Sequence, residues 1–395
     1  MRLTDLDVAI AGAGIGGLSL AIMLARGGVR VTIYDQLERP RAVGSGFVLQ
    51  PPGALVIESL GLLAEVEARG ARIHRMLGRL SRNGRRVLDV GYREGEHGTA
   101  IQRVTLFNLL LRTAIAAGVR FETGRAVREV ETGSKPALIF ANGQKSPAVD
   151  LVVDTMGANS PIELSPRTEL AYGALWATVP WPVDGPFQAD LLEQRYERAR
   201  RMAGVLPVGT EREGAPEMAT FFWSLRNRDI NAWSKAGRGA WVKEVEKLWP
   251  EAAPFAAQAQ PIYARYRHQT RHPVIGRGAI RIGDAWHATS PQLGQGANMA
   301  LIDAASLFLA LQRGETLRSS VATHLKQRRS HIKVYQTLSR VLTPFYQSDS
   351  RLLPATRDLL IGPMTTMPVV RHLITRVVTG DLMNPIKRIG LVGKP

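Results

Sequence analysis

Glycines and one acid near the amino terminus have the spacing of a dinucleotide-binding site. Gly12, Gly14 and Gly17 form the pattern G-x-G-x-x-G, and Asp35 follows about twenty residues later. Glycines at these positions allow a tight turn, close approach of a pyrophosphate to the backbone, and close packing of a helix on a strand. An acid at Asp35 suits hydrogen bonds from ribose hydroxyls. We therefore predict a cofactor site at Gly12, Ala13, Gly14, Ile15, Gly17 and Asp35, with a purely structural tight turn as the alternative.

The surrounding residues predict the elements that this motif requires. Residues 7–11 are typical of a short buried strand, 18–26 of an apolar helix, and 29–34 of a second strand. Together they predict a βαβ unit with the glycines at its first turn. Residues 8–25 carry no charge, but Asp5 and Asp7 precede them and four glycines interrupt them, so we do not expect a membrane span or a signal peptide. We expect a cytoplasmic protein.

A second pattern lies far along the chain, around Asp284. Residues 279–283 read as a strand that ends in this acid, where open α/β sheets bind their ligands. Pro291, Gly294 and Gly296 then form a turn, and apolar residues from Ala297 onward recur with helical spacing. The first N–H groups of that helix would face a ligand at the turn. We expect His287, within this segment, to be a packing or hydrogen-bonding histidine.

The segment from 278 to 304 closely resembles the G-D motif of the FAD-dependent aromatic hydroxylases, the p-hydroxybenzoate hydroxylase-like class A flavoprotein monooxygenases. Weaker similarities extend over almost the whole chain and include residues 39–51 and the helix that begins at Arg103. The resemblance implies FAD as cofactor and NAD(P)H as co-substrate. It also implies that further residues bind FAD, namely Arg41, Gly46, Arg103, Asp284, Pro291, Gly294, Gly296, Ala297 and Asn298.

One position departs from the family pattern. Met156 stands where the family usually has the Asp of an Asp-Gly pair, and Ser160 is not followed by an Arg within four residues. That motif is associated with both FAD and NAD(P)H, so Met156 leaves nicotinamide use open. Asp154 is a candidate to compensate for the missing acid.

Composition limits the remaining possibilities. The chain has 395 residues with no Cys, which excludes disulfides, Cys-bound metals and thiol catalysis. The net charge of +17 favours anionic partners. Residues 321–395 hold twelve Lys or Arg against three Asp, which leaves peripheral contact with an anionic membrane open for this tail. There is no pattern of a nucleic-acid module, and we expect no metal site.

These observations predict an α/β fold in which a discontinuous Rossmann-like FAD-binding fold is combined with a strand-rich substrate domain. We expect residues 1–70, 101–160 and 276–320 to form the FAD-binding domain, and 71–100 and 165–275 the substrate domain. Residues 321–395 are expected to form a basic C-terminal helical region. The strands predicted at 170–181 and 218–225 carry Tyr172, Trp176, Phe222 and Trp223 as candidates for an apolar substrate pocket, or for the packed face of the sheet.

By its resemblance, the chain is expected to be a monooxygenase that hydroxylates or epoxidises a small aromatic or unsaturated molecule through a flavin C4a-hydroperoxide. No catalytic side chain can be named from the sequence, and the oligomeric state is not indicated. Two alternatives stay open: an FAD oxidoreductase of the same fold that does not use NAD(P)H directly, and a non-catalytic, membrane-associated accessory flavoprotein.

Overall fold

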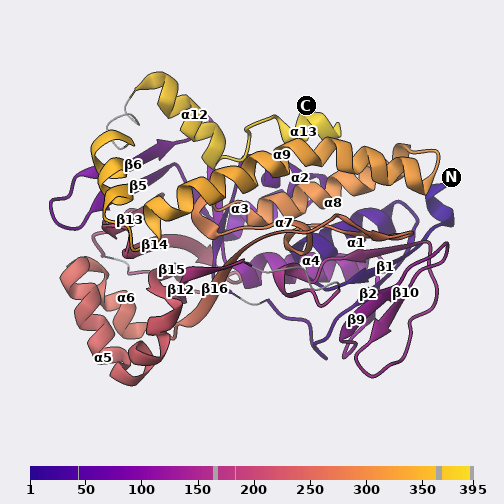
Figure 1. Ribbon diagram of the computed structural model, residues 1–395, viewed down its shortest axis with the longest axis horizontal. Helices are drawn as coiled ribbons and strands as arrows, with labels where there is room; N and C mark the ends of the chain where they lie inside the picture. Colours follow the sequence, from indigo (N-terminus) through magenta and orange to yellow (C-terminus); the bar gives the residue numbers. More distant parts are fainter. Residues whose placement is uncertain (43, 163–167, 183, 362–366, 392–395) are drawn as a thin grey trace.

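The computed structural model describes residues 1–42, 44–162, 168–182, 184–361 and 367–391. The predicted domain boundary at residue 165 and the last four residues of the basic tail lie outside these ranges. Figure 1 shows two sheet regions side by side along the long axis of the molecule, with helices on their outer faces.

The first region is built on a mainly parallel six-stranded sheet. Its strand order is β17-β18-β11-β1-β2-β8, and only the β17–β18 pair is antiparallel. The strands are β1 (Asp7–Ala11), β2 (Arg30–Tyr34), β8 (Arg120–Glu122), β11 (Leu151–Asp154), β17 (Val274–Gly276) and β18 (Ala279–Arg281). The predicted βαβ unit is thus confirmed as the adjacent strands β1 and β2, and the predicted strand before Asp284 is confirmed as β18, which lies in the same sheet and is separated from β1 by β11.

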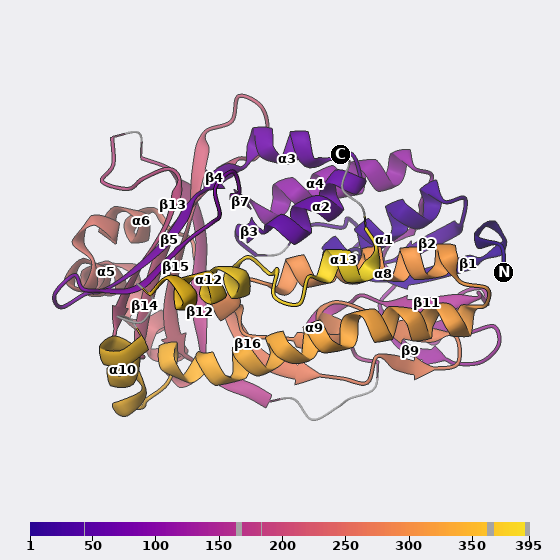
Figure 2. The ribbon, with the colours of Figure 1, turned by 90° about the horizontal axis from the view of Figure 1, so that it is seen from above.

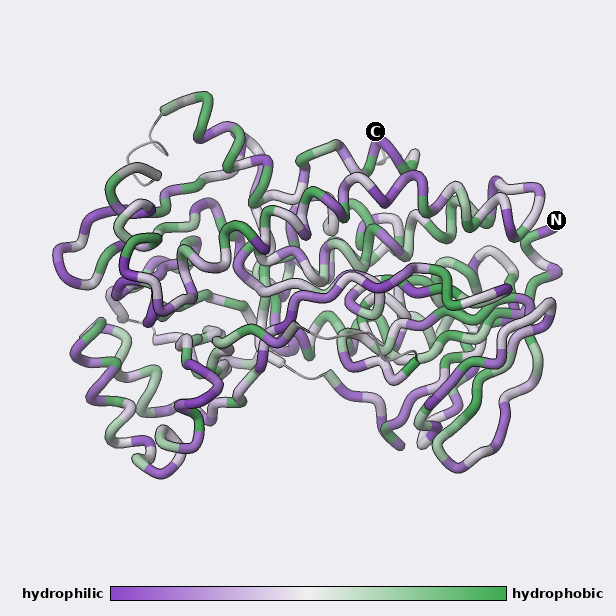
Figure 3. Tube along the Cα trace, viewed as in Figure 1, coloured by the Kyte–Doolittle hydropathy of each residue, from purple (hydrophilic) through white to green (hydrophobic). Residues whose placement is uncertain are grey.

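Apolar residues explain why the face of this sheet beneath the helices is buried. Val8, Ile10, Ile33 and Val153 are almost fully buried in one cluster with the apolar positions of α1 (Ile15–Arg26) and α8 (Gly296–Arg313). Helix α1 packs against both α8 and α4 (Arg103–Ala116). Figure 3 shows green, hydrophobic stretches within this half of the molecule, as it does in the other half.

The second region is a seven-stranded sheet in the order β16-β12-β15-β14-β13-β5-β6. It is antiparallel except where β13 pairs with β5. Its strands are β5 (Arg75–Leu80), β6 (Arg86–Gly91), β12 (Thr168–Pro180), β13 (Leu191–Glu197), β14 (Arg201–Thr210), β15 (Glu217–Arg226) and β16 (Ile262–Thr270). Two chain segments far apart in sequence therefore share one sheet, as Figure 2 shows for β5 beside β13.

Two small sheets and short helices complete the fold. A three-stranded sheet contains β3 (Phe47–Leu49), β7 (Gly98–Ile101) and β4 (Ala71–Ile73), and a hairpin contains β9 (Val127–Glu131) and β10 (Ala137–Phe140). The short elements include η1 (Leu3–Asp5), α2 (Pro51–Ser59), α3 (Leu63–Arg69), η2 (Gly157–Asn159), η3 (Asn227–Asp229), η4 (Pro250–Ala252), α6 (Ala253–Gln258), α7 (Asp284–His287) and η5 (Pro291–Leu293). Helix α5 (Ile230–Leu248) packs with α6 on the outer face of the seven-stranded sheet.

The carboxyl-terminal part is helical, as predicted. Helix α9 (Leu317–Tyr346) begins at Thr316, whose side chain accepts the Ser319 N–H in a capping box. It runs along the long axis from the six-stranded sheet to the seven-stranded sheet (Figures 1 and 2). Shorter elements follow as α10 (Leu352–Thr356), η6 (Arg357–Ile361), α12 (Pro368–Val378) and α13 (Pro385–Ile389).

Candidate cofactor and substrate site

The amino-terminal glycine motif forms a tight turn between β1 and α1. Gly12 has φ of 103°, and its N–H donates to the Tyr34 carbonyl. A Cβ on Gly17 would lie 2.4 Å from the Gly12 carbonyl oxygen and 2.6 Å from Thr155 Oγ1. Both positions therefore exclude a side chain, because helix and strand approach too closely.

Asp35 holds the same turn from the end of β2. Its two carboxylate oxygens accept the N–H groups of Ala13 and Leu37, each at 2.9 Å. Gly14 is exposed at the N-cap of α1, and Ile15 is the first residue of that helix. The helix start thus presents N–H groups without a side chain in front of them, which suits an anion such as pyrophosphate.

Arg103 and Asp284 lie close enough at the second motif for each charge to influence the pKa of the other. The carboxyl of Asp284 is open to solvent, but nearby protein atoms displace much of its hydration and raise its pKa, while His287 and Arg103 act in the opposite direction. Loss of hydration likewise lowers the pKa of Arg103, and Asp284 opposes that shift. Within the described part of the chain Arg103 Nε has no hydrogen-bond partner, and its guanidinium lies over the Phe47 ring at 5.3 Å. A donor enclosed in this way fits an oxygen-rich ligand.

The turn before α8 faces open space next to Asp284. Pro291 and Gly294 are exposed, and a Cβ on Gly294 would meet no atom within 4 Å. A Cβ on Gly296 would meet only Asp284 Oδ1, at 3.7 Å. Ala297 follows in the first turn of α8 and is half-buried. The positive end of an 18-residue helix therefore points to the side where Asp284 lies.

Asn298 and Gly46 connect this site to other parts of the fold. The Asn298 side chain accepts the Gln50 N–H at 2.9 Å and donates to the carbonyls of Val48 and Gly294. Its amide is thus occupied by backbone groups, so it shapes the turn. The N–H of Gly46 donates to Thr220 Oγ1 on β15 at 2.9 Å. Arg41 is exposed and lies outside these contacts.

A buried ionic network behind the site was not predicted. Asp303 on α8 accepts the Gly283 N–H at 2.8 Å and the Arg328 Nε–H at 2.6 Å. Its carboxylate also lies 2.6 Å from His287 Nε2. Asp303 and Arg328 are fully buried, and His287 and Arg328 keep the pKa of Asp303 below its ordinary value despite burial. His287 is therefore the hydrogen-bonding residue we expected, and the network fixes the peptide before Asp284.

The structure corrects the suggestion that Asp154 compensates for Met156. Asp154 is fully buried, accepts the Ser160 hydroxyl at 2.6 Å and the Met156 N–H at 3.0 Å, and lies beside Arg281. Burial raises its pKa. Because other protein groups surround Asp154 completely, its carboxylate does not contact a bound nucleotide in this arrangement.

The seven-stranded sheet presents only some of the predicted aromatic residues toward the cofactor side. Trp176 pairs with Phe222 across β12 and β15, with ring centroids 4.9 Å apart, and Trp176 Nε1 donates to the Tyr266 hydroxyl at 2.7 Å. These rings lie on the same face as Thr220, which contacts Gly46. Trp223 follows the other alternative, the packed face of the sheet, because strand alternation turns it to the opposite face, where it packs with Trp241 of α5.

Two further features were searched for among the described residues. No helix in these ranges is both long and apolar enough to cross a membrane. In the same ranges, no cluster of three or more His, Asp or Glu side chains is arranged to hold a metal ion.

Comparison with known proteins agrees with this geometry. A family model described as an FAD binding domain matches residues 5–161. The 3-amino-4-hydroxybenzoate 2-monooxygenase of Streptomyces cremeus is 29% identical over 333 residues, which are 77% of this chain and 78% of that protein. The 6-hydroxynicotinate 3-monooxygenase of Bordetella bronchiseptica is 26% identical over 321 residues, 76% of this chain and 81% of that protein.

Solved structures share the whole fold. A substituted form of HpxO from Klebsiella pneumoniae, complexed with FAD, superposes with a TM-score of 0.79 at 18% identity, over 95% of this chain and all of that one. A 2-methyl-3-hydroxypyridine-5-carboxylic acid oxygenase gives a TM-score of 0.78 at 21% identity, over 97% of this chain and 98% of that one. With its FAD binding domain and these relatives, the chain is similar to the FAD-dependent aromatic hydroxylases, the p-hydroxybenzoate hydroxylase-like flavoprotein monooxygenases.

Proposed function

We propose that this FAD-dependent monooxygenase uses O₂ and NAD(P)H to hydroxylate, or epoxidise, a small aromatic or unsaturated molecule. The observation that carries the proposal is the meeting of Asp284, Arg103 and the Gly294 turn on the side of the molecule that faces Thr220 of the seven-stranded sheet. The two relatives described above act, as their names say, on substituted aromatic rings, namely 3-amino-4-hydroxybenzoate and 6-hydroxynicotinate.

Each group of residues has a separate task in this proposal. The amides at Gly14 and Ile15 would bind the pyrophosphate of FAD, and Arg103 would supply positive charge. Asp284 would accept hydrogen bonds from polyol hydroxyls, and the first N–H groups of α8 would stabilise negative charge on the ring system. When bound, FAD supplies the chemistry that passes electrons from NAD(P)H to O₂.

The aromatic face of the substrate sheet would position the substrate. Trp176 and Phe222 provide flat apolar surfaces, and Tyr266 is held by the Trp176 N–H. Burial raises the pKa of Tyr266 well above its ordinary value, so its hydroxyl stays protonated and available as a donor. We assign no side chain as a catalytic acid or base.

We also propose the domain division stated from the sequence. Its support is the sheet membership: segments from 1–70, 101–160 and 276–320 contribute to the six-stranded sheet, and segments from 71–100 and 165–275 build the seven-stranded sheet. Residues 321–395 form the third, helical part.

An absorption spectrum followed by anaerobic addition of NADH or NADPH tests the central proposal. We expect an oxidised-flavin spectrum that either nucleotide bleaches. Bound flavin that neither nucleotide reduces, with or without candidate substrates, would favour a partner-reduced oxidoreductase. It would also agree with a loss of nicotinamide use at Met156. Absence of flavin after reconstitution would favour the accessory-protein alternative.

We further propose a cytoplasmic protein that touches anionic membranes through its C-terminal region. Helix α12 exposes Val369 and Leu373, which are 82% and 54% accessible, and it also carries the basic residues Arg371 and Arg376. Figure 3 shows hydrophobic and hydrophilic residues alternating along this helix. Such a face suits the interface of an anionic bilayer.

Co-sedimentation with phosphatidylserine vesicles at low salt tests this contact. Val369→Asp is expected to weaken binding, whereas Val341→Asp, at a valine 56% exposed on α9, serves as the matched control. If the unaltered protein does not bind these vesicles at low salt, the proposed membrane contact is wrong.

A further inference from the structure

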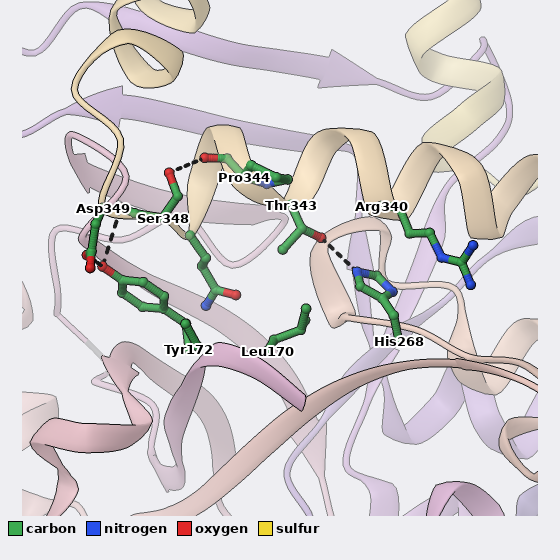
Figure 4. A pocket seen from close by; sticks show the side chains of 10 residues that line it. Leu170, Tyr172, His268, Arg340, Thr343, Pro344, Ser348 and Asp349 are labelled. Carbon is green, nitrogen blue, oxygen red and sulfur yellow. Dashed lines mark hydrogen bonds between the residues drawn. The ribbon is translucent and has the colours of Figure 1, made fainter. Parts of the chain in front are cut away.

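A cavity of about 310 Å³ lies where the start of β12, the end of β16 and the last turns of α9 meet. Figure 4 shows Tyr172 and Asp349 at one end and His268 and Arg340 at the other, with Thr343 between them. The side chains of Leu170 and Pro344 add apolar surface. A cavity of this size accommodates a single-ring organic molecule.

The hydrogen bonds of Thr343 determine which nitrogen of His268 carries the proton. The Thr343 hydroxyl donates to the Ser339 carbonyl at 2.6 Å, so its oxygen has only lone pairs left for other partners. His268 Nε2 lies 3.5 Å from that oxygen and must therefore be the protonated nitrogen. Burial, reinforced by Arg340, lowers the pKa of His268, which keeps the ring neutral.

Nδ1 of His268 is consequently a lone-pair acceptor. It has no hydrogen-bond partner among the described residues, although His268 is only 7% exposed. Figure 4 places this second nitrogen on the side of Arg340. A buried acceptor that no protein group satisfies calls for a donor from a bound molecule.

Gln347 supplies a second acceptor in the same cavity. Its Nε2 donates to the Gly173 carbonyl at 3.5 Å, which leaves Oε1 without a partner in the described part of the chain, and the residue is 6% exposed. Two buried acceptors therefore line the cavity, and both need N–H or O–H donors.

Charge distinguishes the two ends of the cavity. Arg340 is exposed, makes one long hydrogen bond to Thr270 Oγ1 at 3.5 Å, and has no carboxylate within ion-pair distance among the described residues. Asp349, at the opposite end, is paired with Arg226 and accepts the Tyr172 hydroxyl. The charge of Asp349 is thus compensated, whereas that of Arg340 is available to a ligand anion.

We propose that this cavity binds a small aromatic acid that carries an N–H or O–H donor beside its carboxylate. The carboxylate pairs with Arg340, and the donor satisfies Nδ1 of His268 and Oε1 of Gln347. The site is separate from the predicted FAD site. His268, Thr343 and Ser290 form a hydrogen-bonded row between the two sites, and Ser290 immediately precedes Pro291. A ligand bound in this cavity can therefore influence the turn before α8 through Ser290. The proposal does not depend on the reaction proposed above.

Isothermal titration calorimetry of the purified, FAD-loaded protein with anthranilate tests the site. Anthranilate has both the carboxylate and the donor, benzoate lacks the donor, and aniline lacks the carboxylate. We expect anthranilate to bind about tenfold more tightly than either truncated compound, since each loses a hydrogen bond or ion pair to a buried group.

Variants distinguish this cavity from binding near the cofactor. Arg340→Gln should weaken anthranilate binding about tenfold and leave aniline binding unchanged, and Gln347→Leu should weaken anthranilate but not benzoate. Arg329→Gln is the matched control, because Arg329 is also exposed on α9 but does not line the cavity. Melting temperature and FAD content verify that each variant is folded. Undetectable anthranilate binding at millimolar concentration, or equal affinities in Arg340→Gln and the unaltered protein, would overturn the proposal.

Discussion

At the scale of single residues, two glycines of the same turn have different roles. Gly17 is needed for folding, and Gly14 leaves room for the cofactor. Gly17→Ala would place a Cβ 2.4 Å from a backbone oxygen, so we expect apoprotein stability to fall by about 2 kcal/mol or more. Gly14→Ala has room, with its nearest contact at 3.8 Å, but adds a methyl group where the pyrophosphate is expected. Gly14→Ala should therefore leave the stability of the apoprotein unchanged and weaken the binding of FAD. Urea unfolding and FAD titration measure the two effects, and equal loss of stability in both variants would contradict this division.

Asp284 is the single side chain on which FAD retention should depend most strongly. Asp284→Ala removes the carboxylate that accepts polyol hydroxyls, and we expect FAD affinity to fall at least about tenfold because hydrogen bonds to a charged group are lost. Asp190→Ala, at an exposed acid of the substrate sheet, is the control. Equilibrium dialysis with FAD measures both. Full affinity in Asp284→Ala would remove this residue from the cofactor site.

Local residue patterns explain which parts of the site could be predicted. The turn at Gly12 and Gly17 and the strand before Asp284 depend on neighbours within a few residues, so their spacing alone predicted them. The contacts of Asn298 with Gln50, and of Gly46 with Thr220, join segments more than 170 residues apart. No local pattern encodes such pairs, because tertiary packing decides them.

At the scale of elements, α7, α8 and α9 are joined by the buried side chain of His324. His324 on α9 contacts Ser306 of α8 at 3.0 Å, and Trp286 of α7 packs against its ring. Burial lowers the pKa of His324 to about 4, with Arg328 and His287 acting in the same direction and Asp303 against it. The native protein keeps this ring neutral, whereas the unfolded chain protonates it near its ordinary pKa of about 6.5.

This difference predicts how stability depends on pH. Between about pH 6.5 and about pH 4 the unfolded state binds the proton that the native state excludes, so the free energy of unfolding decreases as pH falls. His324→Gln should reduce that slope, and His331 and His268, whose pKa values burial also lowers, should contribute to what remains. His272→Gln, at an exposed histidine, should leave the slope unchanged. Urea unfolding across this pH range measures it, and identical slopes in the two variants would refute the assignment.

At the scale of the whole molecule, the cofactor sheet and the substrate sheet must keep their relative position for any reaction between them. Helix α9 spans both regions (Figure 1), and the Gly46 N–H bonds Thr220 Oγ1 where they meet. The close fit leaves no space for a side chain at Gly46, since a Cβ there would lie 2.4 Å from Val208. Position is therefore set by packing and by hydrogen bonds, which also include those of Gln102 Nε2 and Thr105 Oγ1 to the carbonyls of Gly209 and Thr210.

Thr220→Val tests what the hydrogen bond between Gly46 and Thr220 contributes. The substitution preserves shape but leaves the Gly46 N–H buried without an acceptor, which costs about 1–3 kcal/mol of stability. Thr220→Ser retains the oxygen and should keep the hydrogen bond, although it removes a methyl group. We expect Thr220→Val to unfold at lower urea concentration than Thr220→Ser and to lose FAD more readily, because the loop that carries Gly46 borders the Arg103 side of the site. If Thr220→Val instead matched the unaltered protein in both measurements, the hydrogen bond between Gly46 and Thr220 would contribute nothing to holding the two sheets together.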